Sequence, residues 1–329
     1  MRGSHMLARR FGWAAACLLA CYAQAFAQAP GDQFAPPWQH GANNDAANRG
    51  VEFTVPQIDV LADFHGDLTD PRLVLYVGGN YFFVMAPLVK AFEDVNPAYK
   101  GRLFWETIPP GLLVEQIRAG GRITSGNMTW TARGDVYFAG LGAVNRLIDQ
   151  HLLTGPAIPY VTNTLTIMVH KGNPKAIASL ADLARSDVRL AMPNPEFEGI
   201  ARQIRESLLK AGGEDLAKAI YDSKIADGSA MLTHIHHRQT PLYLMQGLVD
   251  AGVTWQSEAL FQEQIGNPIA HIDIPAAQNA TETYAGAVIA GARHPDAAQA
   301  WLTFIRSPQA MVIFARYGFK PVEAARARR

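Results

Sequence analysis

Cysteine is nearly absent from this sequence, and charge of either sign is scarce. The 329 residues include two cysteines, Cys17 and Cys21, and only 18% are Asp, Glu, Lys or Arg. Both cysteines lie close to the N-terminus, so the rest of the chain has no disulfide and no thiol chemistry. Basic and acidic side chains balance at 29 each, and the charge therefore gives no reason to expect nucleic acid or an anionic membrane surface as a partner.

Catalytic and nucleotide-binding motifs are also missing. The sequence has no Gly-x-Gly-x-x-Gly, no phosphate-loop lysine motif, no Gly-x-Ser-x-Gly and no His-Glu-x-x-His. Gly78-Gly79 follows a strand-like run but lacks the third glycine and the later acidic residue of a dinucleotide loop. We therefore expect a protein that is not an enzyme and needs no cofactor. An exported α/β hydrolase with a triad built from scattered residues stays open as an alternative.

The first 27 residues have the pattern of a secretory signal peptide. A basic segment precedes a short apolar run, Phe11 to Tyr22, and then a small-x-small cleavage site ending at Ala27. This order predicts cleavage after Ala27 and a periplasmic protein. The segment ending at Cys21 resembles a lipoprotein box, so a lipid anchor on Cys21 is the alternative. No later apolar run is long enough to span a membrane.

The remaining sequence predicts an arm followed by α/β units. Residues 28–70 are rich in Pro, Asn, Gln, Ala and Asp, which predicts an extended N-terminal arm. The run Leu73–Val77 is apolar throughout, as in a strand buried on both faces. Strands and helices then alternate over 71–160 and again over 161–276, and this alternation predicts mostly parallel sheets flanked by helices. Two more helices, Pro295–Ile305 and Pro308–Tyr317, are expected near the end of the chain.

Several short segments, in order and at similar spacing, carry a likeness to a known family. The most specific are His294–Ile305, Ser307–Ala310 and Tyr317–Phe319. Weaker matches are Asn163–Leu165, Lys171–Pro174, Leu180–Leu183 and Asp250–Trp255. Over about Leu73 to Pro321 the chain resembles the molybdate- and sulfate-type periplasmic solute-binding proteins of ABC transporters, the type II periplasmic binding proteins.

This resemblance implies an architecture and a function. Residues 71–160 would form lobe 1, residues 161–276 lobe 2, and residues 277–329 would return to lobe 1. A small solute, with a molybdate-like oxyanion as the first candidate, would bind between the lobes at strand ends and helix N-termini. A monomer would then deliver it to an ABC permease in the inner membrane. A divalent metal or a small organic molecule stays open as the solute.

The resemblance also assigns candidate ligand-binding residues, one position at a time. Asn80 stands where the family has a ligand-binding serine, and Pro110 or Gly111 falls at the place of a second serine. Asn163 and Thr164 lie on a stretch that supplies a backbone amide, Glu198 lies near another amide donor, and Trp255 stands where a tyrosine reaches the anion. Tyr81, next to Asn80, is a further candidate.

Two departures from the family pattern bear on the ligand. Both serine hydroxyls are replaced, and Glu198 brings a negative charge that would oppose an oxyanion unless it points away. Residues 122–132, with Trp130, resemble an insertion beside the cleft. The fold and transport role are therefore better supported by the resemblance than the ligand is.

The stretch Thr233–Pro241 contains three histidines and an arginine. Thr240 and Pro241 predict a helix cap and a first helical position, which places His236, His237 and Arg238 just before the helix. They could be a solvated loop, they could hold an anion through the guanidinium fork, or they could bind a metal through imidazoles. The metal interpretation requires a further ligand, such as Glu198 or Glu106.

Overall fold

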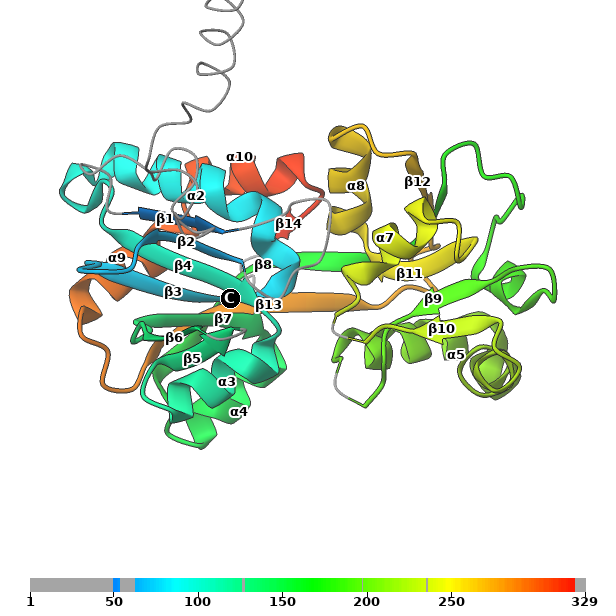
Figure 1. Ribbon diagram of the computed structural model, residues 1–329, viewed down its shortest axis with the longest axis horizontal. Helices are drawn as coiled ribbons and strands as arrows, with labels where there is room; N and C mark the ends of the chain where they lie inside the picture. The colour runs from blue at the N-terminus through cyan, green and yellow to red at the C-terminus, as the bar shows by residue number, and fades with distance from the viewer. Residues whose placement is uncertain (1–49, 54–62, 126–127, 197, 235, 323–329) are drawn as a thin grey trace, which may run out of the picture.

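The computed structural model describes residues 50–53, 63–125, 128–196, 198–234 and 236–322, and it consists of two α/β lobes joined by two long strands (Figure 1). The predicted signal peptide, the lipid-anchor position Cys21 and most of the predicted arm lie outside these residues. Within the described ranges, we find no helix with the length and apolar character that a membrane crossing requires.

Lobe 1 is built on a sheet whose central strands are parallel. Strand β3 (Leu73–Gly78) pairs in parallel with β4 (Leu103–Ile108) on one side and with β7 (Val136–Gly140) on the other. Every residue of β3 is buried, because helices cover both faces of the sheet (Figure 1). This burial explains why the strand is apolar at every position rather than at alternate positions.

The end of the predicted arm belongs to this sheet. Strand β1 (Gly50–Phe53) pairs with β2 (Phe64–Asp67), and β2 pairs antiparallel with β4. The phenyl ring of Phe64 is buried in the lobe 1 core, which ties this segment to the body. Within the predicted arm over 28–70, residues 50–53 and 64–67 therefore form strands of the lobe 1 sheet, with β1 at its edge.

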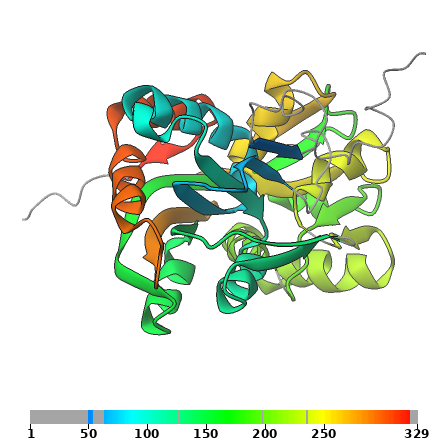
Figure 2. The ribbon, with the colours of Figure 1, turned by 60° about the vertical axis from the view of Figure 1, so that its left-hand side comes forward.

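Two layers of helices enclose the lobe 1 sheet (Figures 1 and 2). One face carries α2 (Phe82–Val95), α9 (Pro295–Phe304) and α10 (Pro308–Arg316), and the other carries α3 (Pro110–Arg118) and α4 (Leu141–Asp149). Trp301 of α9 is fully buried, with its ring centroid 5.0 Å from that of Phe92 in α2. The C-terminal helices thus complete the core begun by the first part of the chain.

Residues 122–132 do not lie where the sequence predicted. Strands β5 (Arg122–Ser125) and β6 (Met128–Thr131) form a separate antiparallel hairpin. The Trp130 ring packs edge-on against Phe64, 4.7 Å between centroids. None of the described residues of this segment lines the cleft between the lobes, so the expected insertion beside the cleft packs on the lobe 1 core instead.

Lobe 2 has its own apolar core, formed between about residues 165 and 280. Its strands are β9 (Leu190–Met192), β10 (Ala230–Leu232), β11 (Ala251–Trp255) and β12 (Ile269–Asp273). Strand β9 pairs in parallel with both β10 and β11. The longer helices around them are α5 (Ile200–Lys218), α7 (Gln239–Met245) and α8 (Gln256–Gln264), with the short α6 (Lys224–Ala226).

Two long strands connect the lobes. Strand β8 (Leu153–His170) is 18 residues long. Its first part pairs with β13 (Thr281–Ile289) and with β14 (Lys320–Pro321) in lobe 1, and its last part pairs with β11 and β12 in lobe 2. The chain therefore passes between the lobes in β8 and returns in the segment that leads into β13 (Figure 1), which is the geometry of a hinge.

Candidate solute-binding cleft

A cleft of about 1260 Å³ opens between the lobes. Its lobe 1 wall is made by the ends of β3 and β7 and by one face of α3 and of α4, from their first turns to their last. Its lobe 2 wall is made by the start of α5 and by the loop before α7, and Trp255, Glu282 and Tyr284 line it near the hinge. The carboxyl ends of parallel strands and the starts of helices thus meet at one place, where open α/β sheets bind their ligands.

Three helices begin at this cleft without a side-chain cap. Pro109, Gly140 and Gly199 occupy the N-cap positions of α3, α4 and α5, and among the described residues none of these helices receives a capping side chain. Unpaired backbone N–H groups and the positive end of the helix dipole make such a terminus attractive to anions. The start of α4 already faces an anion, because a Cβ on Gly140 would lie only 2.8 Å from Glu282 Oε1.

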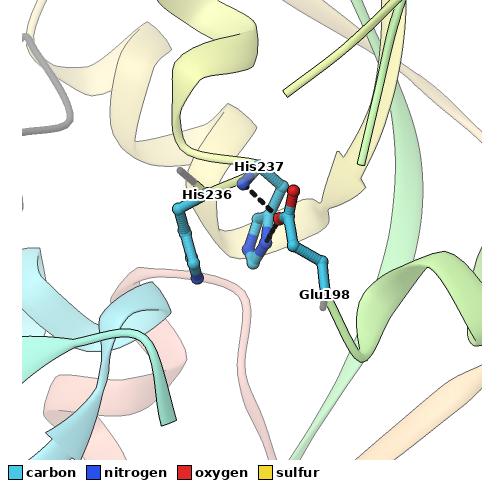
Figure 3. A group of neighbouring side chains, drawn as sticks. All are labelled: Glu198, His236 and His237. Atoms are coloured by element: carbon cyan, nitrogen blue, oxygen red, sulfur yellow. Dashed lines mark hydrogen bonds and ion pairs between the residues drawn. The ribbon is translucent and has the colours of Figure 1, made fainter. Parts of the chain in front are cut away.

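His237 lies at the centre of a buried ionic cluster in lobe 2. Its Nδ1 is 3.0 Å from Glu198 Oε2 and its Nε2 is 3.2 Å from Glu258 Oε1. Its backbone N–H also donates to Glu198, at 2.5 Å (Figure 3). Burial opposes the charged ring, but the two carboxylates, Glu258 foremost, raise the pKa of His237 to about 10. At neutral pH the ring is therefore an imidazolium held between two carboxylates.

The Glu198 carboxylate is fully engaged within lobe 2. One oxygen accepts from the Thr233 hydroxyl and from the Asn194 backbone N–H, and the other accepts from His237. Burial would raise the pKa of Glu198, but the His237 hydrogen bond and charge hold it below its ordinary value. Glu198 was expected to oppose an oxyanion unless it pointed away. The structure places it against His237, which compensates its charge.

The neighbours of His237 face lobe 1. Arg238 Nη1 donates to the Gly79 carbonyl at 3.0 Å and lies 3.4 Å from the Thr107 carbonyl oxygen. Its guanidinium carbon lies 3.9 Å from the centre of the Phe82 ring, a cation–π distance. A Cβ on Gly79 would come within 3.4 Å of both His236 Nε2 and Arg238 Nη1, so this loop bridges the two lobes.

Two expectations for this loop are wrong. His236, His237 and Arg238 are each at most 6% exposed, so they do not form a solvated loop. Helix α7 begins at Gln239, one residue before the predicted cap Thr240, because Gln239 already has helical backbone geometry and Thr240 is buried inside the first turn. The helix therefore follows Arg238 directly.

Glu198, His236 and His237 also have the donor types of a metal site. One ligand atom from each lies within 4.8 Å of the others. Burial, and then the neighbouring His237 and Arg238 charges, hold the pKa of His236 well below its ordinary value, so that ring is neutral. The protonated His237 is the obstacle, because a metal must displace a proton that two carboxylates stabilise. The proposed additional ligand Glu106 is fully buried in lobe 1 and is not part of this group.

The ten sequence-predicted residues fall into three groups. Those that line the cleft are Asn80, Gly111, Glu198, Trp255, His236 and His237. Asn80 Nδ2 donates to the Tyr284 hydroxyl at 2.6 Å, which ties the amide to β13 of the same lobe. Arg238 bridges the lobes beside the cleft. Which of these residues contact solute stays a prediction.

The remaining three predicted residues lie behind the cleft wall. Tyr81 is 1% exposed, and its hydroxyl accepts from that of Tyr160 at 2.7 Å, so it belongs to the lobe 1 core. Asn163 donates to Ser257 at 2.8 Å, and the Thr164 hydroxyl donates to Gln256 at 3.2 Å. These two side chains join the hinge strand β8 to the start of α8.

Glu258, Glu282 and Tyr284 are among the residues of the site that were missed from the sequence. Glu258 lies in the first turn of α8 and was hidden by the helical pattern. Glu282 and Tyr284 lie on β13, within the segment that returns to lobe 1. The available signal for Glu282 was a carboxylate just before the apolar part of this strand, and for Glu258 it was the distance of three residues from Trp255.

Comparison with known proteins places this cleft in a family context. The sequence profile of the bacterial extracellular solute-binding protein family matches residues 73–320. The molybdate-binding protein ModA of Mycobacterium tuberculosis is 24% identical over 243 residues, which cover 72% of this chain and 82% of that protein. The sulfate-binding protein of Escherichia coli is 27% identical over 184 residues, which cover 50% of this chain and 53% of that protein.

A solved structure with the same fold supports the assignment. The sulfate-binding protein SubI from M. tuberculosis H37Rv superposes with a TM-score of 0.60 at 22% identity, covering 78% of this chain and 88% of SubI. The predicted type II periplasmic binding protein fold is confirmed by this likeness and by the two-lobed architecture. The cleft, its uncapped helices and the matched profile lead to one conclusion: the chain belongs to the family of bacterial extracellular solute-binding proteins.

Proposed function

We propose that this protein is the solute-binding component of an ABC importer, that it captures a small oxyanion in the cleft, and that it catalyses no reaction. The relatives named for molybdate and sulfate support the class of solute. The permease of the importer would be its partner, and an extracytoplasmic location follows from the same role.

One observation carries the choice of an oxyanion. Helices α3 and α5 direct uncapped N-termini into the cleft from opposite lobes. Backbone N–H groups and helix dipoles at such termini bind anions without a cationic side chain. The replacement of the two family serines is compatible with this site, because the Asn80 amide gives one N–H to Tyr284 and has a second neutral N–H at the end of β3.

The electrostatics of lobe 2 agree with an anionic solute. Glu198 would repel an anion if its charge were exposed, but His237 compensates it from within the lobe. The start of α5 then faces the cleft next to a carboxylate bonded to an imidazolium rather than a bare carboxylate, and the remaining negative charge of the cluster lies on Glu258, on the other side of the His237 ring. Closure of the hinge would bring the starts of α3 and α5 around the solute.

Isothermal titration calorimetry with phosphate, arsenate, sulfate and molybdate tests this proposal. At least one anion should bind with one-to-one stoichiometry and be recovered unchanged. Asn80→Ala should weaken that binding by about ten- to a hundredfold, the usual cost of a hydrogen bond to a charged partner. Asn96→Ala is the matched control, because the Asn96 side chain donates to the Phe92 carbonyl at the end of α2. Absence of heat from all four anions would exclude an inorganic oxyanion solute.

A further inference from the structure

The cleft contains a second carboxylate in a different setting from Glu198. Glu282 lies on β13, in the hinge, and its side chain lines the cleft. It is only partly buried. Whereas all acceptor positions of Glu198 are directed into lobe 2, Glu282 borders the space where a solute would bind.

Glu282 has one side-chain hydrogen bond among the described residues, from Gln203 Nε2 of α5. It forms no ion pair with any described cation, and Arg202 and Arg146 act on it only through space. The start of α4 lies against its carboxylate and favours a negative charge there. Burial raises the pKa of Glu282, and the Gln203 hydrogen bond, the two arginines and the Thr283 backbone N–H oppose that rise.

A carboxylate can only accept hydrogen bonds, and its two oxygens offer about four acceptor positions. Gln203 and the Thr283 backbone use part of this capacity. A solute in the cleft would therefore meet remaining lone pairs of Glu282. A solute oxygen that carries a proton can donate to them, whereas a fully deprotonated oxyanion can only present its own lone pairs and its negative charge.

We propose that Glu282 is a specificity-determining residue, and that it selects proton-bearing tetrahedral oxyanions of the hydrogen phosphate type over fully deprotonated ones such as sulfate and molybdate. This inference rests on the proposed function, because it assumes that the solute is an oxyanion. The selection works by rejection: the same carboxylate that accepts from a protonated solute repels one without a proton.

Titration of the full-length protein at neutral pH with inorganic phosphate, sulfate and molybdate tests the inference. The wild type should bind phosphate at least about tenfold more tightly than sulfate or molybdate, the effect of one hydrogen bond to a charged group. Glu282→Gln can donate through its amide and should reduce this preference at least about tenfold, mainly by gaining affinity for sulfate and molybdate. Glu206→Gln, at an exposed carboxylate that pairs with Lys210 and does not line the cleft, should leave the preference unchanged.

Two results would overturn the role of Glu282 while leaving the oxyanion proposal intact. These are wild-type binding of sulfate or molybdate as tight as that of phosphate, and an unchanged preference in a folded Glu282→Gln variant. If this variant fails to fold, the ratio of wild-type affinities for phosphate and for sulfate or molybdate decides the question by itself. Binding of none of the three anions would instead overturn the oxyanion proposal, and this inference with it.

Discussion

The two walls of the cleft differ in the interactions that fix the positions of their residues. Lobe 1 presents the end of β3 and one face of α3 and of α4, with glycine at Gly78, Gly111 and Gly140 and with side chains such as Arg118 and Arg146 that take no part in a buried ionic cluster. Lobe 2 presents ionisable side chains, and their positions depend on one another through the cluster around His237. The lobe 1 wall is therefore held by the sheet, whereas the lobe 2 wall is held by charge.

This difference separates the consequences of mutation in the two walls. A side chain of the lobe 1 wall can be removed without disturbing the strand that carries it. A member of the lobe 2 cluster cannot, because each carboxylate would lose the partner that allows its burial. Substitutions in lobe 2 should change stability, and substitutions that touch lobe 1 should change binding.

The largest effect is expected for His237→Ala. The change leaves Glu198 and Glu258 buried with no imidazolium between them, and breaking a buried ion pair typically costs about 3–5 kcal/mol. Urea denaturation should show this loss of unfolding free energy. His234→Ala, at an exposed position of the same loop, should change it by less than about 0.5 kcal/mol. Equal effects of the two variants would mean that the cluster does not hold the lobe 2 wall.

The same cluster predicts how stability depends on pH. Folding raises the pKa of His237 from 6.5 to about 10, so its contribution is complete below pH 6.5 and is lost as the pH rises toward 10. The loss over this range should be on the order of 4 kcal/mol, measured as unfolding free energy at several pH values. His237→Ala should lack this component. A wild-type curve parallel to that of the variant would show that His237 is not charged in the folded state.

Arg238→Ala should have an intermediate effect, on the equilibrium between open and closed lobes. The change removes the hydrogen bond to the Gly79 carbonyl and the contact with Phe82, both across the cleft. Small-angle scattering should show a larger radius of gyration, and solute affinity should fall about tenfold because fewer molecules are closed. Arg185→Ala is the control, since Arg185 pairs with Asp187 within lobe 2 and does not line the cleft. Unchanged scattering for Arg238→Ala would argue against its bridging role.

The smallest effect is expected from a chelator. Protonation keeps His237 from acting as a metal ligand at neutral pH, so EDTA should leave both the melting temperature and the affinity for anions unchanged. A drop in melting temperature that zinc reverses would show that Glu198, His236 and His237 hold a metal, and that lobe 2 is held by an ion and not by charge pairing alone.

The sequence allowed the framework of the fold to be predicted, because local patterns determine it. The unbroken apolar run of β3 indicated a strand covered on both faces, and both C-terminal helices begin at the predicted prolines. Strand β2 was missed because its four residues, Phe64 to Asp67, include only one large apolar side chain. Short polar strands depend on pairing with neighbours, here β1 and β4, and those neighbours are not visible in the local sequence.

The sequence indicated which residues lie at the cleft, but it did not indicate which of their side chains interact. Asn80 and Trp255 were identified because the family resemblance assigns ligand-binding positions to them, and both line the cleft. The pairing of Glu198 with His237 joins residues 39 positions apart, and no pattern in either segment indicates that it forms. For the same reason Glu282 was missed, since its place at the start of α4 depends on the register of β13 against β7.

The path of the chain through the two lobes has a consequence for the order of folding. Lobe 2 draws its core from one continuous stretch, whereas the core of lobe 1 needs residues from both ends of the fold, as in the contact of Phe92 with Trp301. As the chain emerges with its N-terminus first, lobe 2 can fold as soon as it is complete. The apolar strands of lobe 1 stay uncovered until its last helices have been synthesised. Such high contact order makes folding slow and leaves apolar surface exposed to aggregation. Lobe 1, whose first strands are synthesised earliest, is thus the last lobe to complete its fold.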